Sequence, residues 1–79
     1  MEKVEIETAE SLREEGKAAF EAKDYLAGLE AFQRALKLTD ASNVELLSIL
    51  HLNSSRCLFQ LKAYELALRF AKSVTPSSP

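Results

Sequence analysis

Apolar side chains recur at helical spacing along almost the whole chain. They fall into four successive groups: Leu12, Ala19 and Phe20; Leu29, Phe32, Ala35 and Leu36; Leu47, Leu50, Leu58 and Leu61; Tyr64, Ala67, Leu68 and Ala71. A spacing of three or four residues places apolar side chains on one face of an α-helix. No stretch alternates in the way that a half-buried strand does. The pattern therefore predicts an all-α fold.

Polar residues at the starts of these groups indicate where helices begin. We expect four helices, near residues 8–22, 25–38, 43–61 and 63–73. A Ser, Thr, Asp or Asn at a helix start accepts a hydrogen bond from the backbone of the first turn. Thr8 or Ser11 suits the first start, Asp24 the second, and Ser42 the third. The break at Lys62–Ala63, before the fourth helix, carries the weakest signal.

The chain contains an internal repeat with an offset of 39 residues. Identical residues coincide in four pairs: Phe20 and Phe59, Lys23 and Lys62, Tyr25 and Tyr64, Leu29 and Leu68. Small residues coincide in three more: Gly16 and Ser55, Ala18 and Cys57, Gly28 and Ala67. Small side chains let two helix backbones approach, and the aromatic ring fills the space beside them. We therefore predict two copies of a helix–turn–helix unit.

The repeat and the position of Pro76 define the expected organisation of the chain. We expect an N-terminal extension at 1–7, one unit at 8–40, a second unit at 41–74 and a disordered tail at 75–79. The residue before a proline is disfavoured in helical conformation, which ends the last helix near Val74. We expect the apolar side of that helix, with Phe70, Ala71 and Val74, to be uncovered, because the chain is a fragment or short form of a longer array or, alternatively, because this face docks on a partner or a second copy.

Composition and charge narrow the classes of function. The net charge of −2 provides no bulk attraction to nucleic acid or to an acidic membrane. One Cys and one His make neither an internal disulfide nor a metal site, and they leave an enzyme without an ordinary nucleophile–base pair. No apolar run is long enough to span a bilayer, and the acidic start is unlike a signal peptide. We therefore expect a protein-binding, non-enzymatic chain without cofactors, in the cytoplasm or, alternatively, the nucleus.

The first copy, LREEGKAAFEAKDYLAGLEAFQRALKL, resembles a tetratricopeptide repeat. The residues that carry the resemblance are Leu12, Gly16, Phe20, Tyr25, Gly28, Phe32 and Ala35. The second copy, HLNSSRCLFQLKAYELALRFAKSV, resembles the same repeat but departs from it at His51 and Val74. The offset also exceeds the family's period of roughly 34 residues. Covering residues 9–74, the resemblance implies two antiparallel helix–turn–helix units stacked as a short right-handed α-solenoid.

The first helix of each stacked pair lines the concave surface of such an array. Arg13, Lys17 and Phe20 share one face of the first helix, and Asn53 and Arg56 share the corresponding face of the third. Cations neutralise carboxylates, and an amide can hold a backbone or terminal oxygen. These five residues are the candidate site for an extended peptide that ends in a carboxylate.

The resemblance makes this expectation more specific. In tetratricopeptide domains of chaperone adaptors, five side chains clamp the acidic tail of heat-shock chaperones, which ends in Glu-Glu-Val-Asp. Arg13 stands where that clamp usually has Lys, and Asn53 stands where it has Asn. Lys17 departs from the pattern, because Asn is usual there. Two further cations come from a third repeat that this chain lacks. The resemblance thus implies a co-chaperone-type adaptor with a chaperone tail as partner.

Several alternatives stay open at this point. An unrelated four-helix bundle is the alternative to a repeat fold. Arg13 and Lys17 also fit a solvated helix face, and Phe20 fits packing between repeats. Arg56 also suits an ion pair with Glu45 or Glu65. The alternative function is a scaffold segment that docks through its apolar terminal helix with the groove idle, the chain being a monomer or weakly self-associating.

Overall fold

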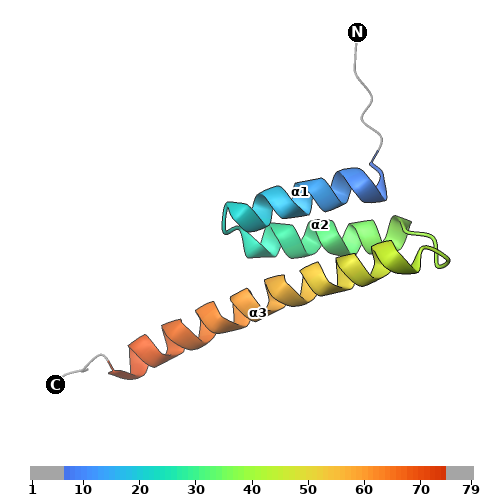
Figure 1. The fold of residues 1–79 in the computed structure, drawn as a ribbon. Helices are drawn as coiled ribbons and strands as arrows, with labels where there is room; N and C mark the ends of the chain where they lie inside the picture. The colour runs from blue at the N-terminus through green and yellow to red at the C-terminus, as the bar shows by residue number, and fades with distance from the viewer. Residues whose placement is uncertain (1–6, 75–79) are drawn as a thin grey trace, which may run out of the picture.

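The computed structural model describes residues 7–74, with the backbone alone from residue 70 onward. It contains three helices: α1 (Ala9–Glu21), α2 (Tyr25–Leu38) and α3 (Val44–Val74). Figure 1 shows α1 and α2 as an antiparallel hairpin and α3 running back along α2, in the same direction as α1. Only α2 packs extensively against both other helices. Residues 7–74 hold no strand, so the all-α, helical-hairpin fold class is confirmed.

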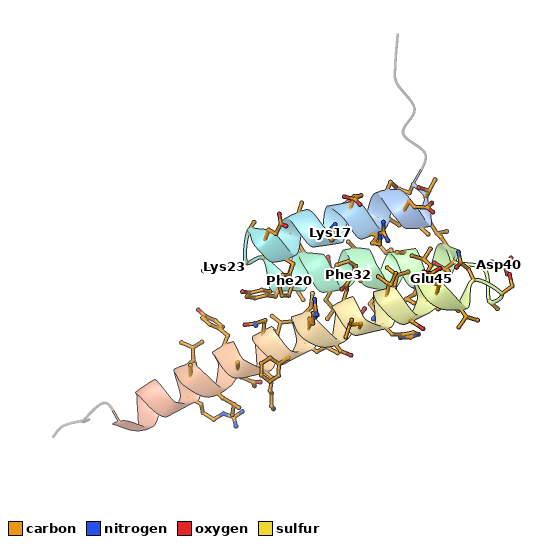
Figure 2. All side chains as sticks on the ribbon, in the orientation of Figure 1. Lys17, Phe20, Lys23, Phe32, Asp40 and Glu45 are labelled. Atoms are coloured by element: carbon orange, nitrogen blue, oxygen red, sulfur yellow. The ribbon has the colours of Figure 1, made fainter. Side chains whose placement is uncertain are left out.

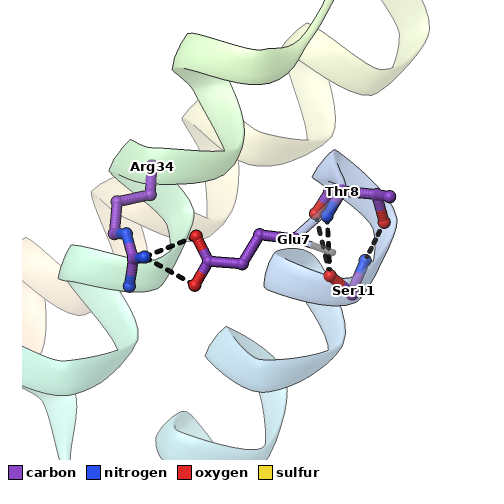
Figure 3. Close-up of polar contacts among 4 residues, drawn as sticks. All are labelled: Glu7, Thr8, Ser11 and Arg34. Atoms are coloured by element: carbon purple, nitrogen blue, oxygen red, sulfur yellow. Dashed lines mark hydrogen bonds and ion pairs between the residues drawn. The ribbon is translucent and has the colours of Figure 1, made fainter. Parts of the chain in front are cut away.

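A capping box at Thr8 starts α1. The Ser11 N–H donates to Thr8 Oγ1 at 3.0 Å, and the Thr8 N–H donates to Ser11 Oγ at 2.9 Å (Figure 3). These bonds satisfy backbone donors that the first helical turn leaves unpaired. Beside this cap, both Glu7 carboxylate oxygens accept hydrogen bonds from Arg34 of α2 (Figure 3). Of the two candidate caps, Thr8 is therefore the one used.

The turn between α1 and α2 depends on two consecutive residues. Lys23 has a φ of 66°, a left-handed conformation that reverses the chain. Asp24 then caps α2, because its carboxylate accepts a hydrogen bond from the Ala27 N–H at 3.3 Å. The rings of Phe20 and Tyr25 meet edge to face across this turn, with their centroids 5.1 Å apart. The expected start of the second helix is confirmed.

The core lies where α2 is covered on both sides. Its buried members are Leu12, Phe32, Ala35, Leu46, Leu50 and Cys57. Two glycines permit this close packing: a Cβ on Gly16 would lie 2.5 Å from the Phe32 ring, and one on Gly28 would lie 3.2 Å from Cys57 Sγ. The expected role of small residues at these positions is confirmed in the first unit.

The start of α3 differs from the expectation. The side chain that caps it is Asn43, whose Oδ1 accepts a hydrogen bond from the Leu46 N–H at 3.2 Å. Ser42 lies one residue too early, and its own N–H donates to Asp40 within the loop. The expected cap at Ser42 is therefore wrong by one residue, because an Asx side chain directly precedes the first helical turn.

The expected break at Lys62–Ala63 is also wrong. Residues 43–61 and 63–73 do not form two helices but belong to the single helix α3, which continues to Val74 and projects beyond the hairpin (Figure 1). The equivalent turn in the first unit has Asp24 as a cap, whereas the second has Ala63, which has no side-chain acceptor. Ala and Lys are strong helix formers, so nothing local ends the helix there.

Some expectations lie outside the described residues. They concern the extension at 1–7, apart from Glu7, the tail at 75–79, and the side chains of Phe70, Ala71 and Val74. The unit boundaries at 8–40 and 41–74 stay predictions. Within residues 7–74, no helix has the length and apolar character needed to cross a bilayer.

Candidate functional site

All five candidate residues line one groove between α1 and α3. The groove has a volume of about 360 Å³. Its lining comprises Arg13, Lys17, Phe20, Glu21, Phe32, Ile49, Asn53 and Arg56. Phe32 comes from α2, and the other residues come from the two flanking helices, α1 and α3. Lys17, Phe20 and Phe32 are labelled in Figure 2. The tertiary structure thus brings together side chains that lie up to 43 residues apart in the sequence, from Arg13 to Arg56.

Helical periodicity positions the two walls of the groove. Arg13, Lys17 and Phe20 are spaced i, i+4 and i+7 along α1 and therefore share a face. On α3, Asn53 and Arg56 are spaced i and i+3. Because α2 separates the backbones of the two walls, side chains from both sides reach into the same space over Phe32.

The cations of the groove are largely free to contact a ligand. Among residues 7–69, the side chains of Lys17 and Arg56 make no hydrogen bond or ion pair. Arg13 is half-buried, and its guanidinium lies 3.7 Å from Glu14, the next residue in the chain. The Nε of Arg13 is buried without a hydrogen-bond partner. A buried donor that lacks an acceptor is costly, so an anionic acceptor in the groove is favoured.

The alternative pairing of Arg56 with an acidic neighbour is not formed. Glu65 instead lies 3.9 Å from Lys62 and 3.3 Å from Arg69, one turn away on either side. No ion pair joins Glu45 to Arg56 within the described residues. Arg56 therefore presents an unpaired guanidinium to the groove.

Three lining residues lie outside the five candidates: Glu21, Phe32 and Ile49. Glu21 follows Lys17 by one helical turn, and that spacing places it on the groove face of α1. Phe32 was expected only as a core residue, and it is both: it is 1% exposed and forms the floor of the groove. The i, i+4 spacing could have revealed Glu21, whereas no sequence signal distinguishes a groove floor from the rest of the core.

A second hollow continues the groove toward the C-terminal half of α3. It has a volume of about 440 Å³ and is lined by Phe20, Ser55, Arg56, Phe59 and Gln60. Phe20 and Arg56 line both hollows, so the groove extends past them. Phe59 is 69% exposed and supplies an uncovered aromatic surface. The extended groove therefore joins a cationic part to an aromatic part.

Within residues 7–69, neither the cysteine nor a cluster of metal-binding side chains adds reactive chemistry to the groove. Cys57 is fully buried in the core, and this burial raises the pKa of its thiol, which keeps it protonated and unreactive at neutral pH. Its interpretation as a small core residue is confirmed. Residues 7–69 contain no group of three or more His, Cys, Asp or Glu side chains placed to hold a metal ion. The groove offers cations, an amide and aromatic rings, which suit a peptide ligand.

The hairpin, the helix stacked on it and the groove between them are consistent with an all-α helical-hairpin solenoid. The chain is 33% identical, over 72 residues, to Heat shock protein STI1 of Saccharomyces cerevisiae. The match covers 91% of this chain but only 12% of that protein. No family model and no solved structure matches the chain. The all-helical structure and this similarity together fit a tetratricopeptide-like repeat.

Proposed function

We propose that this chain is a tetratricopeptide-type interaction module, part of a co-chaperone-type adaptor in the cytoplasm. Its groove binds the acidic C-terminal peptide of a heat-shock chaperone. The observation that carries the proposal is the convergence of Arg13, Lys17, Asn53 and Arg56 on one groove. Similarity to a protein named as a heat shock protein supports the choice of partner.

The chemistry of the groove matches a terminal carboxylate. Arg13 provides a half-buried guanidinium with an unpaired Nε, and Lys17 follows it one turn later. Hydrogen bonds between a cation and a carboxylate contribute roughly 1.5–3 kcal/mol each. Across the groove, the Asn53 amide can donate to a terminal or backbone oxygen. A free C-terminus carries one more carboxylate than an internal acidic segment, so this arrangement favours chain ends.

An NMR amide-shift titration tests the proposal directly. The ligand is a short peptide ending in Glu-Glu-Val-Asp, compared with the same peptide amidated at its C-terminus. We expect the shifts to be confined to the neighbourhoods of Arg13, Lys17 and Asn53, and to be lost with the amidated peptide. A well-dispersed spectrum that does not change with the free acid contradicts the proposal.

Charge reversal provides the matched control. The double substitution Arg13→Glu and Lys17→Glu removes the cations of one groove wall and should abolish peptide binding. The double substitution Lys23→Glu and Lys37→Glu changes the net charge equally at exposed positions that do not line the groove. If both double variants lose binding equally, the attraction is due to overall charge and not to the groove.

A scaffold segment is the second candidate function, and the exposed apolar residues of α3 favour it. They are Leu58, Phe59, Tyr64, Leu66 and Leu68, each about half or more exposed. Such a surface suits docking to another protein. Charge reversal in the groove should leave such an assembly intact. Tyr64→Ser with Leu68→Ser should disrupt the assembly while peptide binding in the groove persists.

A further inference from the structure

The groove contains one carboxylate among its described lining residues, that of Glu21. It lies on the last turn of α1, next to Phe20 and one turn beyond Lys17. The Glu21 side chain is exposed and makes no hydrogen bond or ion pair with any residue in the described range. From Arg13 toward the end of α1, a ligand in the groove therefore lies beside two cations and then beside an unpaired negative charge.

The helix rise sets the distance between these charges. Arg13, Lys17 and Glu21 follow one another at intervals of one turn, about 6 Å each. A carboxylate held between Arg13 and Lys17 thus lies about 9 Å along α1 from the level of Glu21. An extended peptide advances about 3.3 Å per residue. The level of Glu21 therefore corresponds to about the third residue before the terminal one.

The shape of the groove sets the direction of the peptide. The first hollow joins the second through Phe20 and Arg56, which line both. A peptide whose terminal carboxylate lies at Arg13 and Lys17 can therefore extend past Phe20, and it passes Glu21 on the way. In this direction the residue near Glu21 also passes over an aromatic ring.

We propose that Glu21 determines specificity: it favours Lys or Arg, and disfavours Asp or Glu, at about the third residue before the ligand's C-terminus. This inference rests on the proposed peptide-binding function of the same groove. The attraction for a cation and the repulsion of an anion act at one level of the groove, so the preference depends on position. In a ligand that ends in Glu-Glu-Val-Asp, the first of these Glu residues lies three residues before the terminal Asp, so replacing it with Lys should strengthen binding.

Arg56 opposes this preference from the other wall. Its guanidinium makes no ion pair with Glu21, so a ligand side chain can contact either charge. A carboxylate at the third upstream position gains attraction from Arg56 and repulsion from Glu21. Removing each charge should therefore shift the preference in opposite directions, and a local effect confines both shifts to this position, whereas an effect of net charge would appear at every position.

Fluorescence anisotropy with labelled peptides tests the inference. The peptides end in Val-Asp. Each carries one Lys or one Glu two, three, four or five residues before the terminal Asp, with Ala at the other positions. We expect the Lys peptide to bind about fivefold more tightly than its Glu twin at the third position, as for a partly exposed ion pair. The ratio should approach one at the fifth position and should fall in high salt.

Substitutions assign the effect to its residue. Glu21→Gln should bring the Lys-to-Glu ratio at the third position below about twofold, because a neutral amide leaves no net charge to discriminate. Arg56→Gln should increase that ratio. Glu15→Gln is the matched control, since Glu15 is an exposed carboxylate of α1 that does not line the groove.

The outcomes separate this inference from the proposed function. If the peptides bind but the ratio is the same at every position, or Glu21→Gln and Glu15→Gln have equal effects, the role of Glu21 is overturned while the groove function stands. If no peptide binds and the NMR titration is also flat, both are overturned. A ratio that peaks at the third or fourth position and collapses only in Glu21→Gln supports the inference.

Discussion

The two copies of the internal repeat share their main packing residues, but the first is a helical hairpin and the second is a straight helix. In the first copy, Lys23 and Asp24 form the turn between α1 and α2. Their counterparts Lys62 and Ala63 lie within α3. The comparison shows that similar packing residues do not ensure a turn, because a helix ends where the backbone finds a cap.

The same residue pair therefore has different surroundings in the two copies. Phe20 and Tyr25 meet edge to face across the first turn. Their counterparts Phe59 and Tyr64 are 69% and 65% exposed. Gly16 is buried beneath the ring of Phe32, but its counterpart Ser55 is exposed. Predictions that compare equivalent positions can test how far this contrast determines stability and reactivity.

The largest expected effect on stability is at Gly16. In Gly16→Val, the new Cβ would lie within 2.7 Å of three atoms of the Phe32 ring, and the buried ring has little room to move. Overpacking of this kind should lower the free energy of unfolding by about 3 kcal/mol. Ser55→Val, at the exposed equivalent position, should change it by no more than about 0.5 kcal/mol. Urea denaturation measures both, and equal losses would contradict the assigned packing.

The next effect is on thiol reactivity along α3. Cys57 is 0% exposed, whereas residue 55, two positions earlier, is exposed. In a Ser55→Cys variant, the new thiol should react with a chromogenic disulfide reagent on the order of 100-fold faster than Cys57, which must wait for the core to open. Stopped-flow absorbance resolves the two phases. A single fast phase would place Cys57 at the surface instead.

A smaller effect is expected at the helix cap. Asp24→Ala removes the acceptor for the Ala27 N–H and should cost about 1 kcal/mol of unfolding free energy. The reciprocal change, Ala63→Asp, places an acceptor within α3 and should cost about 0.5 kcal/mol through reduced helix propensity. Thermal unfolding followed by circular dichroism measures both. A stabilising Ala63→Asp would show that the second copy readily adopts a turn.

The smallest effect is on the pH dependence of stability. Burial raises the pKa of the Cys57 thiol above its ordinary value of 9.0, so the folded chain holds this proton to higher pH than the unfolded chain. The contribution of the neutral thiol is complete below pH 9.0 and is lost as the pH rises above it. Wild type should therefore lose more stability than Cys57→Ala between pH 8 and pH 10, as measured by urea titration.

Local signals in the sequence predicted much of the fold. The caps at Thr8 and Asp24 and the periodic apolar residues placed α1 and α2 within about one residue. The errors occurred where such signals were weak or ambiguous. At the third start, Ser42 and Asn43 are both capping residues, and the loop hydrogen bond to Asp40 decided between them. At Lys62–Ala63 the 39-residue repeat indicated a turn. Ala63 has no side-chain acceptor to cap a new helix, so the turn does not form.

The candidate groove was predictable for a related reason. Arg13, Lys17 and Phe20 share a face of α1 because they are spaced i, i+4 and i+7. Asn53 and Arg56 share a face of α3 because they are spaced i and i+3. Which residues stand opposite them depends on the packing of α1 and α3 against α2. That packing introduced Glu21 into the lining and left Leu52, although on α3 and 53% exposed, outside both hollows.

The sequence by itself determined the helical class, the first hairpin and the faces on which the cations lie, because these follow from periodicity and from hydrogen bonds within a few residues. The tertiary structure decided how the two walls meet, which cations remain unpaired and how far α3 continues. Those features depend on the close approach permitted by Gly16 and Gly28, and on solvent exposure of α3 beyond the end of the hairpin. Contacts between segments distant in the sequence, with no local signal of their own, produce them.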